Sequence, residues 1–327
     1  MTRFISLAPF VAVAVCLAVG LVTAAALAPP AMGQENVPTI GILVTRPKIP
    51  AFDELPRRLA QLGHVAGGTV RLEYRYAEGR TERLARLAAE LVRLDVAVIV
   101  AIDTPAVRAA KEATTTIPIV MAAGEPVGTG LIDSLARPGG NITGVSGTSA
   151  QITGKALSLF RELLPRATRL GLVIHRTDPF TRPFREQTHA AARRLGLEVH
   201  EEIVDGPKEV PAALASAIRA RVDGVYVQGI LATRELAARA LRARLPALSH
   251  SGQFAGLGGL MGYGADPLEL YGGLAVYVDK ILKGAKPGDM PVQEPRNFIL
   301  SVNLNTARAI GLTIPPSVLL QVDDAIE

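Results

Sequence analysis

The stretch VAVIVAIDTPAVRAAKEATTTIPIVM, residues 96–121, decides the fold. It opens with an unbroken apolar run at 96–101, which is typical of a strand buried on both faces of a parallel sheet. In the turn that follows, Thr104 can cap a helix and Pro105 suits the first helical position. The spacing then predicts a helix over 106–114 and a second buried strand over 117–121. Together these pieces make a strand–helix–strand unit of an α/β fold.

The same alternation extends along most of the chain. Strands are predicted over residues 39–44, 69–76, 169–174, 198–204, 224–227 and 246–248, and helices over 52–62, 82–94, 156–164, 184–195, 209–220 and 233–244. The pattern restarts after residues 141–145, and a single sheet holding every strand would be unusually wide. The sequence therefore predicts two doubly wound parallel-sheet lobes with helices on both faces.

The last third departs from this simple alternation. A strand at 260–263, a long helix at 267–282, a strand at 298–302 and a helix at 303–310 fit a chain that crosses back to the first lobe and returns. This arrangement makes a three-crossover hinge. We expect lobe 1 to comprise residues 34–142 and 263–290, and lobe 2 to comprise residues 143–262 and 291–327.

The N-terminus has the form of an export signal. Arg3 precedes an uncharged apolar run over residues 5–28, and Ala31-Met32-Gly33 offers small residues for a signal peptidase. We expect residues 1–33 to be a signal peptide cleaved before Gln34, which makes the protein periplasmic. The alternative is an uncleaved anchor, because the run is long enough to span a bilayer.

The composition of the remaining chain excludes several function classes. Cys16 is the only cysteine and follows Val15 rather than a small residue, so lipidation is not expected, and its removal leaves no thiol. Removal of Arg3 lowers the net charge from +5 to +4, and no run of Lys or Arg indicates nucleic acid. No second apolar run reaches spanning length, so we expect the protein to be soluble. We also expect it to be a monomer.

Groups for catalysis are not evident in the sequence. The five histidines show no metal-ligand spacing, and neither a nucleophile elbow nor a phosphate-binding loop is present. The glycine-rich segments 124–130 and 256–259 lack the spacing of a dinucleotide site. The sequence therefore predicts no metal, no cofactor and no enzymatic activity.

Residues at the carboxyl ends of the predicted strands are the candidates for ligand binding, because ligands of open parallel sheets bind there. The candidates are Thr45, Arg46, Asp103, Thr104, Pro105, Gly124, Glu125, Pro126, His175, Asp178, Phe180, Gln228, Gly229, His250, Phe254 and Tyr263. Arg46 or Arg176 can pair with a carboxylate, and the aromatic candidates can stack on a ring. The alternative is that Thr104, Asp178 and Ser251 only cap helices.

Seven segments resemble the ABC transporter substrate-binding proteins of the tryptophan/tyrosine-transport type. They are YRYAEGR (74–80), DTPA (103–106), TTTIPIV (114–120), GEPV (124–127), RPGGNITGV (137–145), KILKGAKP (280–287) and NLNTARAIGLTIPP (303–316). The last is the most specific, and the resemblance runs through the whole chain after residue 34. It implies the type I periplasmic-binding-protein fold, capture of a small organic solute such as an amino acid or another carboxylate, and delivery to the permease of an ABC importer.

The resemblance also implies roles for individual residues. Ligand contacts carry over to Thr104, Glu125, Pro126, Asp178, Gln228 and Phe254. The chain departs from the family pattern at 175–177 and at 227–230, so the ligand stays open. Three other readings are a sensory protein that presents its ligand to a receptor, an enzyme on the same fold, and the effector domain of a repressor. The last would need a helix-turn-helix where the signal segment stands.

Overall fold

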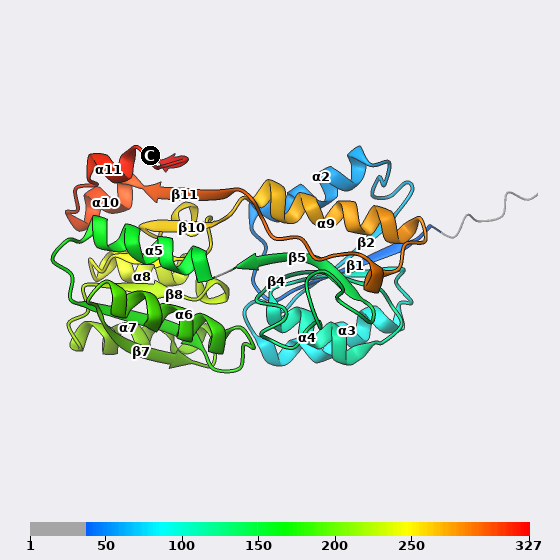
Figure 1. Cartoon of the computed structure of the whole chain (residues 1–327), viewed down its shortest axis with the longest axis horizontal. Helices are drawn as coiled ribbons and strands as arrows, with labels where there is room; N and C mark the ends of the chain where they lie inside the picture. The colour runs from blue at the N-terminus through cyan, green and yellow to red at the C-terminus, as the bar shows by residue number, and fades with distance from the viewer. Residues whose placement is uncertain (1–36, 149) are drawn as a thin grey trace, which may run out of the picture. The chain divides into compact units, whose positions relative to one another are not determined.

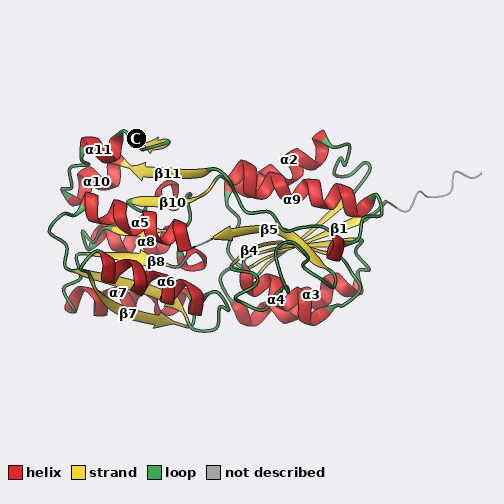
Figure 2. Ribbon diagram, viewed as in Figure 1, coloured by secondary structure: helices red, strands yellow, loops and turns green. Residues whose placement is uncertain are grey.

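The computed structural model describes residues 37–148 and 150–327, and residues 38–327 form one compact unit with two sheets (Figure 1). The predicted signal peptide at 1–33 lies outside the described residues. Each sheet is covered by helices on both faces, as Figure 2 shows. This is the two-lobed α/β fold that the sequence predicts.

The first sheet has the order β2-β1-β3-β4-β5, and all of its neighbouring strands run parallel. Its strands are β1 (Thr39–Val44), β2 (Arg71–Tyr76), β3 (Val98–Ile102), β4 (Ile119–Gly124) and β5 (Ile142–Thr148). Gly144 on β5 has a φ of 139°, and a Cβ there would lie 2.2 Å from the Met121 carbonyl oxygen, so only glycine fits this close approach.

Helices cover the first sheet in two pairs. They are α2 (Glu54–Gln61), α3 (Leu84–Arg93), α4 (Thr104–Ala113) and α9 (Pro267–Leu282), with short 3₁₀ turns at Pro50–Asp53, Thr81–Arg83 and Pro287–Asp289. Alternate residues of β1 divide between the faces: Ile42 packs in the core beneath α2 and α9, and Leu43 in the core beneath α3 and α4. This period of two is what a strand buried on both faces requires.

The second sheet is mixed, which corrects the expectation of a purely parallel one. Its order is β12-β11-β10-β9-β8-β6-β7, with β10 and β11 antiparallel. Its strands are β6 (Arg169–His175), β7 (Glu198–Val204), β8 (Gly224–Val227), β9 (Ala247–Ser249), β10 (Met261–Ala265), β11 (Phe298–Asn303) and β12 (Asp324–Ile326). The antiparallel pair arises because β10 leads the chain out to the first lobe and β11 brings it back.

The helices of the second lobe also lie on both faces. They are α5 (Ala150–Leu163), α6 (Thr181–Arg194), α7 (Val210–Arg219), α8 (Arg234–Arg242), α10 (Leu304–Ile310) and α11 (Pro316–Leu319), with 3₁₀ turns at Pro207–Glu209, Gly229–Leu231 and Ala255–Leu257. Asn303 caps α10 by accepting a hydrogen bond from the Thr306 amide, and left-handed Gly311 ends it. The short α11 and β12 were not predicted.

Strand pairing moves the predicted lobe boundaries. The boundary after 142 cuts β5, which pairs with β4 along its length and belongs to the first sheet. The boundary after 262 cuts β10, which pairs with β9 and β11 in the second. Past the predicted boundary at 290, Gln293 exchanges backbone hydrogen bonds with Gly144 and Ser146 beside β5. The chain therefore crosses between β5 and α5, between β10 and α9, and between Gln293 and β11.

Candidate ligand-binding site

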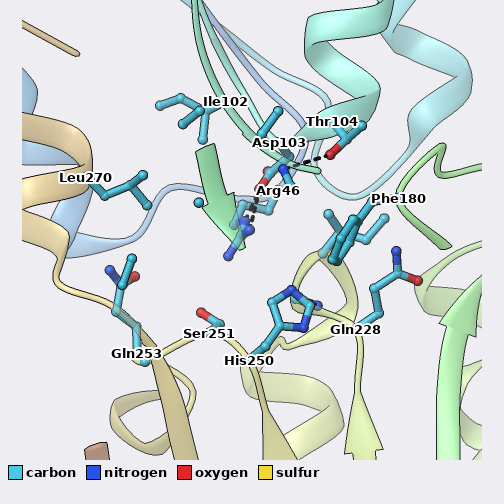
Figure 3. A pocket seen from close by; sticks show the side chains of 18 of the residues that line it. Arg46, Ile102, Asp103, Thr104, Phe180, Gln228, His250, Ser251, Gln253 and Leu270 are labelled. Atoms are coloured by element: carbon cyan, nitrogen blue, oxygen red, sulfur yellow. Dashed lines mark hydrogen bonds and ion pairs between the residues drawn. The ribbon is translucent and has the colours of Figure 1, made fainter. Parts of the chain in front are cut away.

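A cavity lies between the carboxyl ends of the two sheets (Figure 3). The space there, counted together with its opening to solvent, is ≈ 680 Å³. Nine predicted residues line it: Arg46, Asp103, Thr104, Gly124, Asp178, Phe180, Gln228, Gly229 and His250. They come together because parallel strands of each sheet end at one edge, and the two edges face each other across the cavity.

The first lobe contributes an ion pair. Arg46 follows β1 and Asp103 follows the adjacent β3, so the register of the sheet sets the side chains next to each other. Arg46 Nε donates to Asp103 Oδ2 at 3.0 Å, and Arg46 Nη2 bonds Asp103 Oδ1. Burial alone would lower the pKa of Arg46, but the Asp103 carboxylate raises it above its usual value. The pair is charged and bidentate.

The backbone at Asp103 is strained. Asp103 has a φ of 75° and stands at the N-cap of α4, with Thr104 and Pro105 in the first turn. This corrects the expectation that Thr104 caps the helix. The Thr104 hydroxyl instead accepts a hydrogen bond from the Gly124 amide at 3.3 Å and ties the end of β4 to α4. Left-handed backbone at a residue other than glycine is stored strain of the kind that concentrates at functional sites.

The second lobe contributes a buried carboxylate in a neutral network. Asp178 Oδ1 accepts from the Phe180 amide at 2.9 Å, and Oδ2 accepts from Gln228 Nε2 at 2.7 Å. The Gln228 amide is oriented because its Oε1 accepts from the His175 amide at 2.8 Å. Burial raises the pKa of Asp178 to about 7, with a smaller increase from Asp103, while the Phe180 amide and Arg46 oppose it.

His250 is a neutral group in the same lobe. Burial, with a smaller contribution from nearby Arg46, lowers its pKa to about 3. Its Nε2 accepts from the Gly229 amide at 3.3 Å, so the proton of the neutral ring is on Nδ1. Nδ1 is buried and has no partner among the described residues. His250 therefore holds one buried N–H group without a hydrogen-bond partner in the described part of the second lobe.

Apolar and aromatic side chains form the remaining walls. Leu270 and Tyr271 come from the start of α9, and Ile102 from the end of β3. The Tyr271 ring packs edge-on against Phe52 with the ring centroids 5.1 Å apart. Burial raises the pKa of Tyr271 to about 12, so its phenol is neutral. Such walls accommodate an apolar or aromatic group beside the charged centre.

Direct contacts join the lobes next to the cavity. A Cβ added to Gly124 would lie 2.8 Å from the ring of Phe180, so the second lobe packs directly on the first. Gln187 Nε2 on α6 donates to Glu125 Oε1 at 2.8 Å. Thr81 and Thr177 also approach, with 3.4 Å between their hydroxyl oxygens. The structure is therefore a closed arrangement of the lobes.

Four other predicted residues stand beside the cavity without lining it. Thr45 is fully buried and bonds the Ile102 carbonyl, and Pro105 is buried in the first turn of α4. Glu125 points to Gln187, and the Pro126 carbonyl accepts from the Leu131 amide. These residues shape the turns of the first lobe.

Three further predicted residues belong to the second lobe's framework. His175 is buried behind the cavity, and burial lowers its pKa. The Phe254 ring is fully buried in the core and packs where a Cβ on Gly259 would stand. Tyr263 packs on Phe298 with ring centroids 6.1 Å apart. Arg176, the other expected carboxylate partner, pairs with Asp205 on the surface.

Other lining residues were not among the candidates, although those at 230 and 251–253 also follow predicted strands. These are Ile102, Ala122, Ala123, Gly147, Ile230, Ser251, Gly252, Gln253, Ala265, Leu270 and Tyr271. The helix at 267–282 was predicted, but only the second crossover brings its start to the cavity. Across the described ranges no cluster of three His, Cys, Asp or Glu could hold a metal ion. None of the helices in residues 37–148 and 150–327 has the length and apolarity needed to span a membrane.

Comparison with known proteins agrees with this geometry. A family model described as ABC transporter substrate binding protein matches residues 52–326. The tyrosine-binding protein of Clostridioides difficile (strain R20291) is 28% identical over 289 residues, which cover 85% of this chain and 81% of that protein.

Two solved structures are similar over nearly the whole described chain. A conserved domain protein from Vibrio cholerae is 27% identical with a TM-score of 0.81, and covers 88% of this chain and 99% of its own. An ABC domain from Streptococcus pneumonia in complex with L-Trp is 26% identical with a TM-score of 0.80 and the same coverage of both chains. The predicted type I periplasmic-binding-protein fold is confirmed.

Proposed function

We propose that this chain, which belongs to the family of ABC transporter substrate-binding proteins and so captures a small solute for an importer, takes an α-amino acid as that solute. The observation that carries the proposal is the charge pattern of the cavity. Arg46 and Asp103 form a salt bridge there, and the second carboxylate, Asp178, lies on the opposite lobe.

The cavity has donors for a carboxylate. A guanidinium carries five N–H groups, and Asp103 engages only part of those on Arg46. The remaining N–H groups of Arg46 and the free Nδ1–H of His250 suit the two oxygens of a ligand carboxylate. Both residues line the cavity, and they come from different lobes, so a carboxylate between them would favour closure.

The cavity also has acceptors for an ammonium group. Asp103 and Asp178 line it from the two lobes, and Asp103 raises the pKa of Asp178, as expected for like charges brought together. A ligand ammonium would relieve that repulsion, whereas a ligand with only a carboxylate would increase it. A zwitterion therefore fits better than a simple carboxylic acid. The names of two similar proteins, which refer to tyrosine and to L-Trp, support the same class.

The family supports the other parts of the proposal. We propose that the protein works without catalysis, as a monomer, and hands its ligand to the permease subunits of an ABC importer. We also propose that residues 1–33 are removed before Gln34 on export to the periplasm. Mass spectrometry of protein recovered from the periplasm tests the cleavage site, and sedimentation of the same sample tests the monomer.

Calorimetric titration with matched ligands tests the ligand class. We expect L-tyrosine or L-tryptophan to bind, and the corresponding amine and desamino acid to bind at least ~100-fold more weakly, because each lacks one charged group and leaves buried charges unpaired. A ligand at 100 times its Kd stabilises the protein by about 2.7 kcal/mol, so thermal unfolding gives an independent readout. Equal binding of the desamino acid would overturn the zwitterion proposal.

A further inference from the structure

The Tyr271 hydroxyl is a polar group at the cavity that the protein itself does not use. Tyr271 lines the cavity, and its side chain belongs to a residue that is only 4% exposed. The hydroxyl has no hydrogen-bond partner among the described residues, whereas the Tyr277 hydroxyl, further along α9, donates to the Pro291 carbonyl at 2.6 Å. A buried tyrosine hydroxyl usually has a partner, because an unpaired one costs free energy.

The Tyr271 hydroxyl is open to the cavity rather than enclosed by protein atoms. It is not one of the fully buried side-chain atoms without a partner, a set that includes Gln253 Oε1 and the Tyr226 hydroxyl. Since it has no partner and is not fully enclosed, it borders space that water can enter, and the space that Tyr271 lines is the cavity. The hydroxyl is therefore available to a bound solute.

The ring and the helix that carry this hydroxyl are held in place. The Tyr271 ring packs edge-on against Phe52, with the ring centroids 5.1 Å apart. Glu269, in the first turn of α9, accepts hydrogen bonds from the Arg296 and Asn297 amides at 2.9 Å and 2.8 Å. These bonds tie the start of α9 to the crossover that returns to β11. The hydroxyl is thus presented from a fixed backbone, as a selective contact requires.

The ion pair of the first lobe acts on the Tyr271 hydroxyl. Burial is the main reason that the pKa of Tyr271 rises to about 12; Arg46 opposes the rise and Asp103 adds to it. Tyr271 in turn contributes to the pKa of Arg46. The phenol therefore keeps its proton at neutral pH and lies within electrostatic reach of the guanidinium. Because Arg46 already holds both oxygens of Asp103, the phenol O–H is left for another acceptor.

We propose that the Tyr271 hydroxyl donates a hydrogen bond to the carboxylate of the bound solute, beside the Arg46 N–H groups that Asp103 leaves free. This inference rests on the proposed amino-acid function and adds to it a recognition residue from the helix that follows the second crossover. A carboxylate attracted to Arg46 is a strong acceptor for a neighbouring O–H group. An ammonium group is not held there, because the guanidinium repels it.

Titration of wild type and Tyr271→Phe with L-tyrosine or L-tryptophan, whichever wild type binds more tightly, tests this contact. The variant keeps the ring and loses only the hydroxyl. We expect it to bind the amino acid ~10- to 100-fold more weakly, as for other hydrogen bonds to charged groups. The corresponding desamino acid keeps the carboxylate and should show the same loss. The corresponding amine has no carboxylate and should bind both proteins equally.

Tyr277→Phe is the matched control on the same helix. It removes a hydrogen bond within the protein, so we expect a lower unfolding temperature and an unchanged affinity. Tyr271→Phe removes no hydrogen bond between described residues, so its unfolding temperature without ligand should stay at or above that of wild type. The two variants should therefore separate an effect on ligand affinity from an effect on stability.

The outcomes distinguish this inference from the proposed function. Unchanged affinity of Tyr271→Phe for the amino acid, an equal loss for the amine, or an equal loss in Tyr277→Phe would overturn the carboxylate contact while amino-acid binding stands. Binding of neither amino acid by wild type, with a normal thermal unfolding transition, would overturn the proposed function itself.

Discussion

The two lobes bring opposite kinds of chemistry to one cavity. The first lobe offers Arg46 and Asp103, two full charges that already satisfy each other. The second offers groups that are neutral or close to it and only partly satisfied: Asp178 with its raised pKa, neutral His250 and the unpaired Oε1 of Gln253. The charges of the first lobe are already paired without a ligand, whereas the second lobe keeps buried polar atoms without a partner.

This difference suggests a division of labour. A preformed ion pair needs little rearrangement to accept the charged groups that all α-amino acids share. Unpaired neutral groups discriminate, because a ligand that does not match them leaves them buried and unsatisfied. The first lobe should therefore determine affinity for the class, and the second should determine selection within it and the response to pH.

Breaking the ion pair of the first lobe should have the largest effect on ligand affinity. Arg46→Ala leaves the Asp103 carboxylate buried without its partner and removes a donor for the ligand, so we expect an affinity loss of about 3–5 kcal/mol, at least ~100-fold in Kd. Titration calorimetry measures it. Arg176→Ala removes a surface pair with Asp205 and serves as the control, with an expected change below about 1 kcal/mol. Equal losses in both variants would contradict a special role for Arg46.

The second lobe should respond to pH through Asp178. Its pKa rises from 3.8 in the unfolded chain to about 7 in the ligand-free fold, so its stabilising contribution is complete below pH 3.8 and is lost as the pH rises to 7. Asp178→Asn stays neutral throughout. Between pH 5 and pH 7 we expect the variant to gain about 2 kcal/mol relative to wild type.

Chemical unfolding of the ligand-free proteins at several pH values measures this gain. Asp205→Asn alters a half-exposed carboxylate of the same lobe and is the control. A constant difference between Asp178→Asn and wild type from pH 4 to pH 8 would show that Asp178 titrates normally and would remove the pH response from the second lobe.

Removing the hydrogen bond between the lobes should have the smallest effect on ligand binding. Glu125→Ala removes the hydrogen bond from Gln187 that spans them, which contributes about 0.5–1 kcal/mol. We expect a two- to fivefold faster dissociation of the ligand, measured by stopped flow. We expect Gln187→Ala to show the same increase in dissociation rate. The double variant should dissociate no faster than either single variant. An additive double variant would mean that the two side chains act separately.

Local sequence patterns were sufficient to predict much of the lining of the cavity. Arg46, Asp103 and Asp178 follow strands whose apolar runs are unmistakable, and the geometry of parallel sheets brings such residues to one edge. The fold followed from the same runs. Lobe boundaries were less accurate because β5 and β10 resemble any strand, and only their hydrogen-bond partners decide which sheet they join.

The errors concern side chains whose direction depends on tertiary packing. Phe254 was predicted to face the ligand, yet its ring fills the core and the adjacent Gln253 lines the cavity. Tyr271 was missed because it lies on a helix that comes to the cavity only through the second crossover. Sequence spacing gives the period of a strand or helix, but a turn such as 250–254 has no period to follow.

The hydrogen bond between Glu125 and Gln187 also marks a place to attach an optical reporter. The chain has no tryptophan, and its single cysteine, Cys16, lies in the segment predicted to be removed. A cysteine at position 187 would then be the sole thiol of the exported protein, on the seam where the lobes meet. A dye coupled there would brighten or dim as the lobes part, and would make the protein a reagentless sensor for its own ligand.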